Sequence, residues 1–499
     1  MTTHQYRMQA CKDDARRAGE RDRVLLEARR PGLTRRPGAG LVAQVTRGAR
    51  LLSRFQTGLA FAVDNPLRMT ARGRVGYRLI LVAALVGLVV PLAAAWPATA
   101  APREGTAPLD MVTQWNLTMI AGLEAAAIPP PPSARIGAIV QASVFDAVNG
   151  IERRYAFYRV APAAPHGTSR AAAAIGAAYT TLVALIPGQK PLFDAQLAAT
   201  LAQISDDPSH PGRSIQRGLA WGRTVATDIL TLRATDFATP PPPYVVGSAP
   251  GDWQPTPPLF LGPPAAPLFR QFATMTPFAL TSPAQFAPPG PPPLTSARYA
   301  RDLAEVAAFG SATSTVRTAE QTQTALFWQN DTPAAIWNRA ADQLAQDHHL
   351  TLIGNARLLA QMNIALADAT IAIWNAKNTD NFWRPVTAIR ATSDPAWTPL
   401  LPTPVFQEYP SAHSGVSSAA ASVLAAFYGN DTSFTVTTAG LTGVQRDFTS
   451  FSAAVLQVED ARIYAGFHFR FSCIDAATLG RHVARYVTHT LMQPLRRTR

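Results

Sequence analysis

Two cations stand seven residues apart in the segment KNTDNFWRP. Lys377 and Arg384 would lie on nearly one face of a continuous helix, about 20° apart, and Pro385 would then end or kink that helix. Such a pair suits a tetrahedral oxyanion, because arginine offers a two-pronged donor and lysine a compact charge. A solvated helix face would show the same spacing. Against that alternative, neighbours such as Trp374 and Phe382 are apolar, and lysine occurs at only two other positions of the chain.

A second cluster is the segment YPSAHS, which precedes an alanine-rich run. It brings a hydroxyl, backbone amides and an imidazole to a helix N-terminus, where anions bind well. His413 could act there as a general acid or base, since its ordinary pKa lies near neutral pH. The alternative is simple N-capping by Ser411 beside an incidental histidine.

A third cluster pairs Arg462 with His468 in ARIYAGFHFRF. Six residues correspond to about 240° of helix rotation, so the two side chains cannot share one face of an ideal helix. We therefore expect the helix to bend or stop between them, at Gly466. A histidine among so many aromatic residues could also be an ordinary core residue.

The elements that must position these residues are helices. Residues 104–235 are alanine-rich with little strand-like alternation, and helical patterns resume at 298–310, 317–329, 334–346, 353–378, 411–428, 452–466 and 474–494. Ser411 is placed to open the helix over 411–428, and Gly429 to close it. The sequence has no internal repeat, glycine-rich phosphate loop or alternating strand–helix pattern. We expect an all-α body.

Between these two helical regions lies a proline-rich segment. Residues 240–293 contain 18 of the 43 prolines, which excludes a regular helix or a central strand there. Aromatic residues such as Trp253 and Phe272 are frequent in the same stretch. Such a composition predicts a segment packed over the surface rather than a free linker.

The positive charge of the chain is confined to its beginning. Residues 1–78 carry 17 Arg or Lys against 6 Asp or Glu, which is +11 of the net +13, so the body is nearly neutral. Nucleic acid is therefore not an expected partner. Cys11 and Cys473 are too few for a disulfide framework or a zinc finger.

The apolar run from Leu79 to Ala95 follows three arginines and precedes an Ala-Thr-Ala sequence. This pattern predicts a Sec-type signal peptide over 69–100 and an exported protein, periplasmic or secreted, although an uncleaved membrane anchor remains an alternative. Residues 1–68 are expected to be either an over-extended start or a disordered basic extension.

Taken in order, Lys-x6-Arg-Pro, Pro-Ser-x-His and Arg-x5-His resemble the vanadium-dependent haloperoxidases. That family shares its site with the type-2 phosphatidic acid phosphatases (PAP2) and with bacterial acid phosphatases. The resemblance covers most of residues 110–495, including AVNGIERRYAFY and RTAEQTQTALFWQND, which look like segments of bacterial members of the haloperoxidase branch. It implies two helical bundles, an N-terminal one over 101–239 and a catalytic one over 298–499, joined by the segment 240–297.

The resemblance implies a vanadate cofactor with His468 as the metal ligand. It also implies that Lys377, Arg384 and Arg462 neutralise the vanadate oxygens. The remaining oxygen contacts would come from the hydroxyl of Ser411 and the backbone N–H of Ala412.

The other implied roles concern peroxide and halide. His413 would move the protons of hydrogen peroxide, and Asp331 would support it. Trp374 and Phe406 match aromatic positions that line the halide side of chloroperoxidases, which favours a chloroperoxidase-like pocket. The implied reaction oxidises halide with hydrogen peroxide to hypohalous acid, which then reacts with a small organic acceptor.

Two alternatives remain open at this point. The cage could hold a phosphate ester instead, without a cofactor, and act as a phosphatase through a phosphohistidine at His468. The chain could also be a non-catalytic exported protein that retains the fold.

Two departures from the family pattern bear on the choice among these functions. Ala412 replaces a glycine, and Ser472 stands where phosphatases have an aspartate, with Asp475 further along. The oligomeric state is left open.

Overall fold

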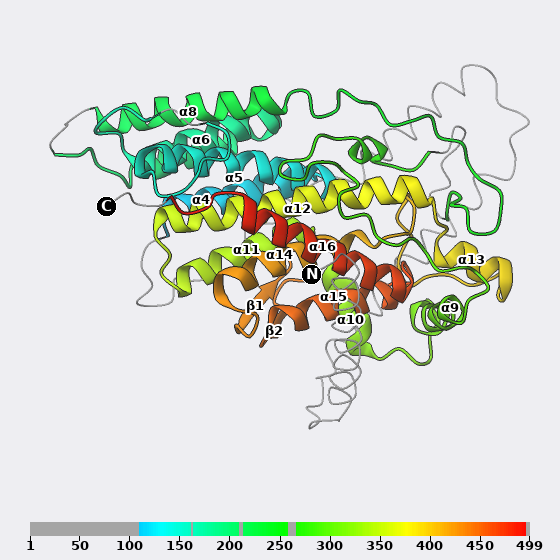
Figure 1. The fold of residues 1–499 in the computed structure, drawn as a ribbon. Helices are drawn as coiled ribbons and strands as arrows, with labels where there is room; N and C mark the ends of the chain where they lie inside the picture. The colour runs from blue at the N-terminus through cyan, green and yellow to red at the C-terminus, as the bar shows by residue number, and fades with distance from the viewer. Residues whose placement is uncertain (1–108, 161–162, 209–212, 258–265, 496–499) are drawn as a thin grey trace, which may run out of the picture. The chain divides into compact units, whose positions relative to one another are not determined.

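Alanine-rich runs preceded by Ser, Thr or Asp form the helices of the computed structural model, which describes residues 109–160, 163–208, 213–257 and 266–495 (Figure 1). Asp110, Ser169 and Thr351 are among the residues whose side-chain oxygens accept a first-turn N–H and so begin a helix. The predicted basic extension and signal segment, at 1–100, lie outside the described residues.

The helices of the first half are α4 (Met111–Ala125), α5 (Pro130–Glu152), α6 (Arg170–Leu185), α7 (Lys190–Leu201) and α8 (Ser214–Arg233), with a short 3-10 helix η1 (Pro187–Gln189) before α7. The second half contains η2 (Arg270–Ala273), α9 (Ala297–Gly310), α10 (Ala319–Gln329), α11 (Pro333–Asp347), α12 (Leu352–Asp380), α13 (Pro385–Thr392), α14 (Ala412–Tyr428), α15 (Phe451–Tyr464) and α16 (Arg470–Thr490). Strands β1 (Phe434–Thr437) and β2 (Gln445–Phe448) form one antiparallel hairpin between α14 and α15.

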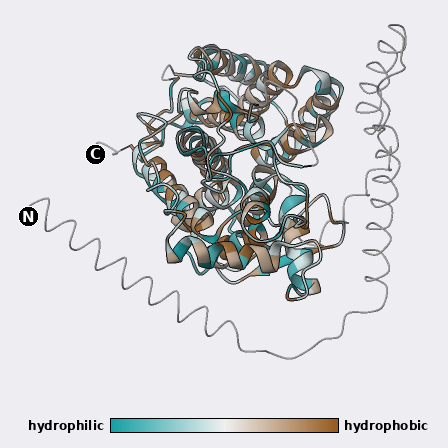
Figure 2. Ribbon diagram, turned by 90° about the vertical axis from the view of Figure 1, so that its right-hand side faces the viewer, coloured by the Kyte–Doolittle hydropathy of each residue, from teal (hydrophilic) through white to brown (hydrophobic). Residues whose placement is uncertain are grey.

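Helix α12 is the centre of the fold. It is apolar on all sides, and it packs against α5 on one side and against α14 and α16 on the other, while α6 and α8 cover α5. Among the described helices, α12 is by itself long and apolar enough to cross a membrane, but 94% of its most apolar window is buried inside the protein. Along many other helices, hydrophobic and hydrophilic positions occur side by side (Figure 2). We conclude that α12 is a core helix around which amphipathic helices pack.

The proline-rich segment packs directly against α12. The carboxylate of Asp368 in α12 accepts three backbone N–H bonds of 2.6–2.9 Å from Phe278, Ala279 and Leu280. Trp253, which lies nearer the N-terminal end of this segment, is fully buried. The preceding residue, Asp252, forms a β-bridge with Phe382. Because Phe382 follows α12 directly, this segment also covers the chain that carries Arg384.

The predicted all-α class is confirmed, with one small hairpin that the sequence pattern did not indicate. The described residues form one compact unit, and its main hydrophobic cluster draws on helices from α4 to α16. The proposed boundaries at 239 and 297 remain predictions. The three predicted chemical clusters lie at the end of α12, the start of α14 and the turn between α15 and α16.

Candidate active site

Lys377 comes from the last turn of α12 and is completely buried. Its ammonium group donates hydrogen bonds of 2.7 and 2.8 Å to the backbone oxygens of Gln407 and Glu408. Burial, and then the neighbouring Arg384, lower the pKa of Lys377 well below its usual range. The lysine is therefore a structured buried cation, not part of a solvated helix face.

Arg384 lies at the same site as Lys377, but it does not belong to the same helix. Helix α12 ends at Asp380, where Asn381 adopts a left-handed conformation, and Pro385 begins α13 instead of ending a helix. Lys377 and Arg384 thus converge across a helix break, not along one helix face. The guanidinium of Arg384 donates to the backbone oxygens of Phe406 (2.8 Å) and Phe467 (3.0 Å).

Arg462, at the end of α15, is the third buried cation. One of its terminal nitrogens donates a 3.0 Å hydrogen bond to the side chain of Gln329, and its guanidinium lies 4.8 Å from the ring of Phe467. It forms no salt bridge with a carboxylate of the described residues. Burial lowers its pKa to about 10. The expected break after Arg462 is confirmed, because α15 ends at Tyr464 and Gly466 has a positive φ of 82°.

His468 is held between a carboxylate and a guanidinium. Its Nδ1 lies 2.7 Å from Oε1 of Glu408, and its Nε2 lies 3.2 Å from a terminal nitrogen of Arg384. Because Arg384 can only donate, Nε2 carries a lone pair and Nδ1–H donates to the carboxylate. Burial lowers the pKa of His468 well below its usual range, so the ring is neutral. A neutral imidazole with a fixed tautomer is what a metal ligand requires.

Glu408 is the functional residue that sequence reasoning missed. It is fully buried, and besides His468 it accepts the backbone N–H of Phe469 at 3.0 Å. Burial raises its pKa to about 7. The partner of His468 is therefore neither Ser472 nor Asp475, since Asp475 instead accepts a hydrogen bond from Tyr409 at 3.0 Å. The available signal was a lone carboxylate three residues before Ser411.

The segment YPSAHS begins α14 as predicted, with Ser411 at the N-cap position. The hydroxyl of Ser411 does not cap the helix and lies 3.0 Å from the hydroxyl of Ser414. Simple N-capping therefore does not explain this serine. Ala412 is the first helical residue and does not have a positive φ, so alanine in place of glycine brings no left-handed strain.

Trp374 and Phe406 lie together beside the cations. Their ring centroids are 5.4 Å apart, and the ammonium of Lys377 lies 5.4 Å from the Phe406 ring. The guanidinium of Arg384 lies 5.0 Å from the same ring. Trp374 also lines a cavity of about 20 Å³ together with Ala412 and His413. Two aromatic side chains thus screen one side of the cation cluster from water.

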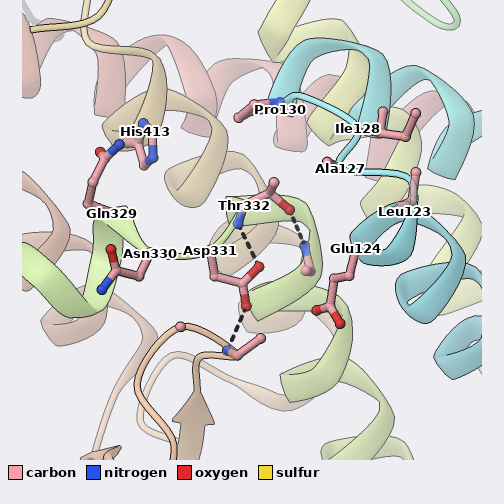
Figure 3. A pocket seen from close by; sticks show the side chains of 13 residues that line it. Leu123, Glu124, Ala127, Ile128, Pro130, Gln329, Asn330, Asp331, Thr332 and His413 are labelled. Atoms are coloured by element: carbon pink, nitrogen blue, oxygen red, sulfur yellow. Dashed lines mark hydrogen bonds between the residues drawn. The ribbon is translucent and has the colours of Figure 1, made fainter. Parts of the chain in front are cut away.

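His413 lies where this buried site meets a larger pocket of about 530 Å³ (Figure 3). The pocket is formed by the α4–α5 turn, the α10–α11 turn, the start of α14 and the hairpin loop at Ala439 and Gly440. Among the described residues, none forms a hydrogen bond with the His413 imidazole. Burial, and then the nearby Arg462, lower the pKa of His413 well below its usual range. A neutral His413 can accept a proton from a molecule that enters through the pocket.

Asp331 lines the same pocket but does not hydrogen-bond to His413. Its carboxylate accepts the backbone N–H groups of Thr332 (2.6 Å) and Ala439 (3.1 Å) and pairs with Arg339. The resemblance implies that Asp331 supports His413. In the structure the Asp331 carboxylate instead bonds to the hairpin loop, at Ala439, and to α11, at Arg339. Gln329, two residues earlier, lies nearer to His413 in the pocket wall and also holds Arg462 (Figure 3).

The site as a whole is built to receive an anion. Three cations are buried there, and Glu408 is the buried carboxylate beside Lys377 and Arg384. Several donors lack any partner within the described residues, namely one terminal nitrogen of Arg384 and both the Nε and a terminal nitrogen of Arg462. An unpaired buried donor costs about 1–3 kcal/mol, so such groups are retained where a ligand satisfies them. A tetrahedral oxyanion such as vanadate or phosphate fits these donors beside Nε2 of His468, which carries a lone pair.

Comparison with known proteins supports this interpretation. Residues 357–497 match the family model described as the second helical-bundle domain of VCPO. A bacterial vanadium-dependent iodoperoxidase is similar in structure, with 27% sequence identity, a TM-score of 0.66, and coverage of 78% of this chain and 97% of that one.

Two further similar structures are the apo and holo forms of a bacterial vanadium-dependent chloroperoxidase. Each is 18% identical to this chain, with TM-scores of 0.56 for the apo form and 0.57 for the holo form. The apo form matches 72% of this chain over 95% of its own length, and the holo form matches 73% of this chain over 93% of its own length. At 18% identity, these two matches support a shared fold and nothing more. No curated protein matches the sequence. The resemblance to vanadium haloperoxidases in fold and second-bundle sequence is thereby confirmed.

Proposed function

We propose that this protein is a vanadium-dependent haloperoxidase, which oxidises halide with hydrogen peroxide to hypohalous acid. The observation that carries the proposal is the set of unpaired buried donors of Arg384 and Arg462 near Nε2 of His468, whose lone pair faces Arg384. The similarity to a bacterial vanadium-dependent iodoperoxidase supports it.

In this proposal the chain's own residues hold vanadate from several sides. Nε2 of His468 is the metal ligand, and Glu408 fixes the ring through Nδ1. Lys377, Arg384 and Arg462 neutralise the oxygens, and the hydroxyl of Ser411 and the backbone N–H of Ala412 donate to them. When bound, vanadate supplies Lewis-acid activation of hydrogen peroxide.

His413 acts on hydrogen peroxide, and the aromatic side chains of Trp374 and Phe406 contact halide. Neutral His413 accepts a proton from hydrogen peroxide arriving through the pocket and later returns it to the leaving oxygen. Halide binds beside Trp374 and Phe406, where Lys377 supplies positive charge and the rings exclude water. An aromatic residue at position 406 favours a chloroperoxidase-like pocket.

A phosphatase is the second candidate, and one observation favours it. The Nδ1–H of His468 donates to Glu408, which strengthens Nε2 as a nucleophile toward phosphorus. His413 would then protonate the leaving oxygen of a phosphate ester.

The cellular setting is part of the proposal and rests on the sequence alone. Leu79–Ala95 and the Ala-Thr-Ala sequence after it favour export, with membrane attachment only if the segment is retained.

The test is halide oxidation by the purified full chain, stripped of bound anions and titrated with orthovanadate. Oxidation of iodide and bromide should appear with vanadate, be blocked by phosphate, and vanish in His468→Ala. Arg470→Met is the matched control, because Arg470 pairs with Glu305 and Asp460 away from the site. Phosphomonoester hydrolysis inhibited by vanadate, without halide oxidation, would favour the phosphatase. Neither activity, in a folded sample, would indicate a non-catalytic protein.

A further inference from the structure

The three buried cations of the site share one feature, which is that every oxygen they bond to is uncharged. Lys377 donates to two backbone oxygens, and Arg384 donates to two others. Arg462 donates to the side-chain amide oxygen of Gln329 at 3.0 Å. None of the three forms a salt bridge in the described part of the chain, and the buried glutamate of the site bonds to His468.

Elsewhere in the protein, arginines of this kind are paired with carboxylates. Arg233, the other buried arginine among the described residues, pairs with Asp236 at 2.7 Å. Arg470, which begins α16, pairs with Glu305 at 2.8 Å and Asp460 at 2.6 Å. A carboxylate partner offsets the penalty of removing a cation from water, whereas a neutral oxygen offsets only part of it. The site cations are therefore held in a way that is less favourable for the fold but leaves each charge without a bonded counter-charge.

The position of Gln329 is fixed by the packing of α10, of which it is the last residue, against α15. The preceding residue, Trp328, is buried and donates a 3.1 Å hydrogen bond to the side chain of Gln457 in α15. Because arginine can only donate, the atom of Gln329 that faces Arg462 is the amide oxygen. The same side chain is directed toward His413 at the inner end of the pocket (Figure 3).

Gln329 differs from the backbone oxygens in that its charge is set by the residue type. Glutamate has the same length and would keep the acceptor, and it would form a stronger, charge-assisted bond with Arg462. It would also neutralise a buried cation, so it would be the more stabilising residue in the protein without an anion. The same negative charge would oppose any anion bound by Arg462.

We propose that Gln329 is a positioning residue that holds Arg462 without neutralising it, so that the charge and the two unpaired nitrogens of Arg462 are kept for the anion. The inference rests on the proposed function, in which that anion is vanadate. Gln329 acts through Arg462 and needs no contact with the anion. A change of Gln329 to glutamate should therefore move stability and anion affinity in opposite directions.

The experiment compares Gln329→Glu and Gln329→Met in the vanadate-free full chain at neutral pH, with inorganic phosphate as the probe. Calorimetry measures phosphate affinity, and urea unfolding without phosphate measures stability. Gln329→Glu should weaken phosphate binding at least about tenfold and raise the midpoint of urea unfolding. Gln329→Met removes the acceptor without adding charge, so it should weaken phosphate binding by a smaller factor and should not raise the midpoint.

The matched control is Asn330→Asp, which makes the same change from amide to carboxylate one residue further along. Asn330 also lines the pocket, but it is exposed, and the side-chain bond of Arg462 is to Gln329. Its added charge is screened by solvent, so phosphate affinity should change by less than about twofold. An equal loss in Asn330→Asp and Gln329→Glu would reflect the overall charge of the pocket and would overturn the role of Gln329.

The outcomes separate this inference from the proposed function. Wild-type phosphate affinity in Gln329→Glu, or a loss in Gln329→Met as large as in Gln329→Glu, would overturn the inference, even if the vanadate-loaded chain oxidises halide. The expected pattern of phosphate affinities without any halide oxidation would overturn the haloperoxidase and leave the role of Gln329 intact. Failure of the wild type to bind phosphate or orthovanadate would overturn both.

Discussion

Replacement of Arg462 by methionine tests whether the cations of the site are kept for a ligand or for the fold. Arg462 is fully buried, has no carboxylate partner among the described residues, and leaves two nitrogens without a protein partner there. Its one side-chain hydrogen bond is to Gln329, which lines the pocket, where water can replace the lost donor. A residue selected for stability would not be left in this state.

The magnitude follows from these contacts. Replacing a buried ion pair or triad by apolar side chains of similar volume is often neutral or stabilising by about 1–4 kcal/mol. The same reasoning applies to Arg462, because it has no carboxylate partner whose charge would be left unpaired among the described residues. The lost hydrogen bond to Gln329 and the contact with the Phe467 ring oppose this gain. We therefore expect the free energy of unfolding of Arg462→Met without anion to rise by roughly 1–2 kcal/mol.

The assay is urea unfolding of the full chain with and without phosphate. Phosphate at roughly 100 times its dissociation constant should add about 2.7 kcal/mol to the wild type, and far less to Arg462→Met. Arg470→Met is the control, since Arg470 is paired with Glu305 (2.8 Å) and Asp460 (2.6 Å). That variant should be less stable than the wild type and keep the full phosphate effect. The reasoning is refuted if Arg462→Met is destabilised by more than about 1 kcal/mol and still gains the full increment from phosphate.

Three further predictions concern individual groups of the site. Glu408→Gln should weaken orthovanadate binding by about 10- to 100-fold, because the carboxylate fixes the His468 ring, and unchanged affinity by calorimetry would remove Glu408 from the site. His413→Ala should retain vanadate binding but lower bromide oxidation roughly 10²- to 10⁴-fold, and full turnover would assign the proton transfer elsewhere. Sulfate binding to the vanadate-free protein at mildly alkaline pH should take up protons, because the bound dianion raises the lowered pKa of Lys377, so affinity should fall as pH rises. Calorimetry in two buffers of different ionisation enthalpy measures this uptake, and proton release would contradict the assignment.

Local patterns in the sequence were sufficient to predict most helices. The alanine-rich run after Ser411 and the break at Gly466 have local causes, a helix-start residue and a glycine free to adopt a positive φ. The predicted helix over 353–378 ends close to the observed end at Asp380, but its left-handed cap was not predicted, because Asn381 can continue a helix or end it in that conformation. The hairpin of β1 and β2 is only four residues long on each side, too short for a clear alternation.

The chemical residues could be named from sequence, but some of their partners could not. Glu408 lies 60 positions from His468, and Gln329 lies 133 positions from Arg462. Pairing over such distances depends on how α10, α15 and the loop before α14 pack, which no local pattern contains. For Asp331, the family pattern suggested a partner that the structure does not show. The resemblance implied His413, whereas the Asp331 carboxylate bonds to Arg339 and Ala439.

The most direct test of the account is a crystal structure of the full chain with orthovanadate, with vanadium located by its anomalous scattering. We expect a single strong peak at bonding distance from Nε2 of His468, with the unpaired nitrogens of Arg384 and Arg462 directed at the vanadate oxygens. A peak bound elsewhere, or no peak in crystals of the folded protein at saturating vanadate, would contradict the claim that these buried cations exist to hold vanadate.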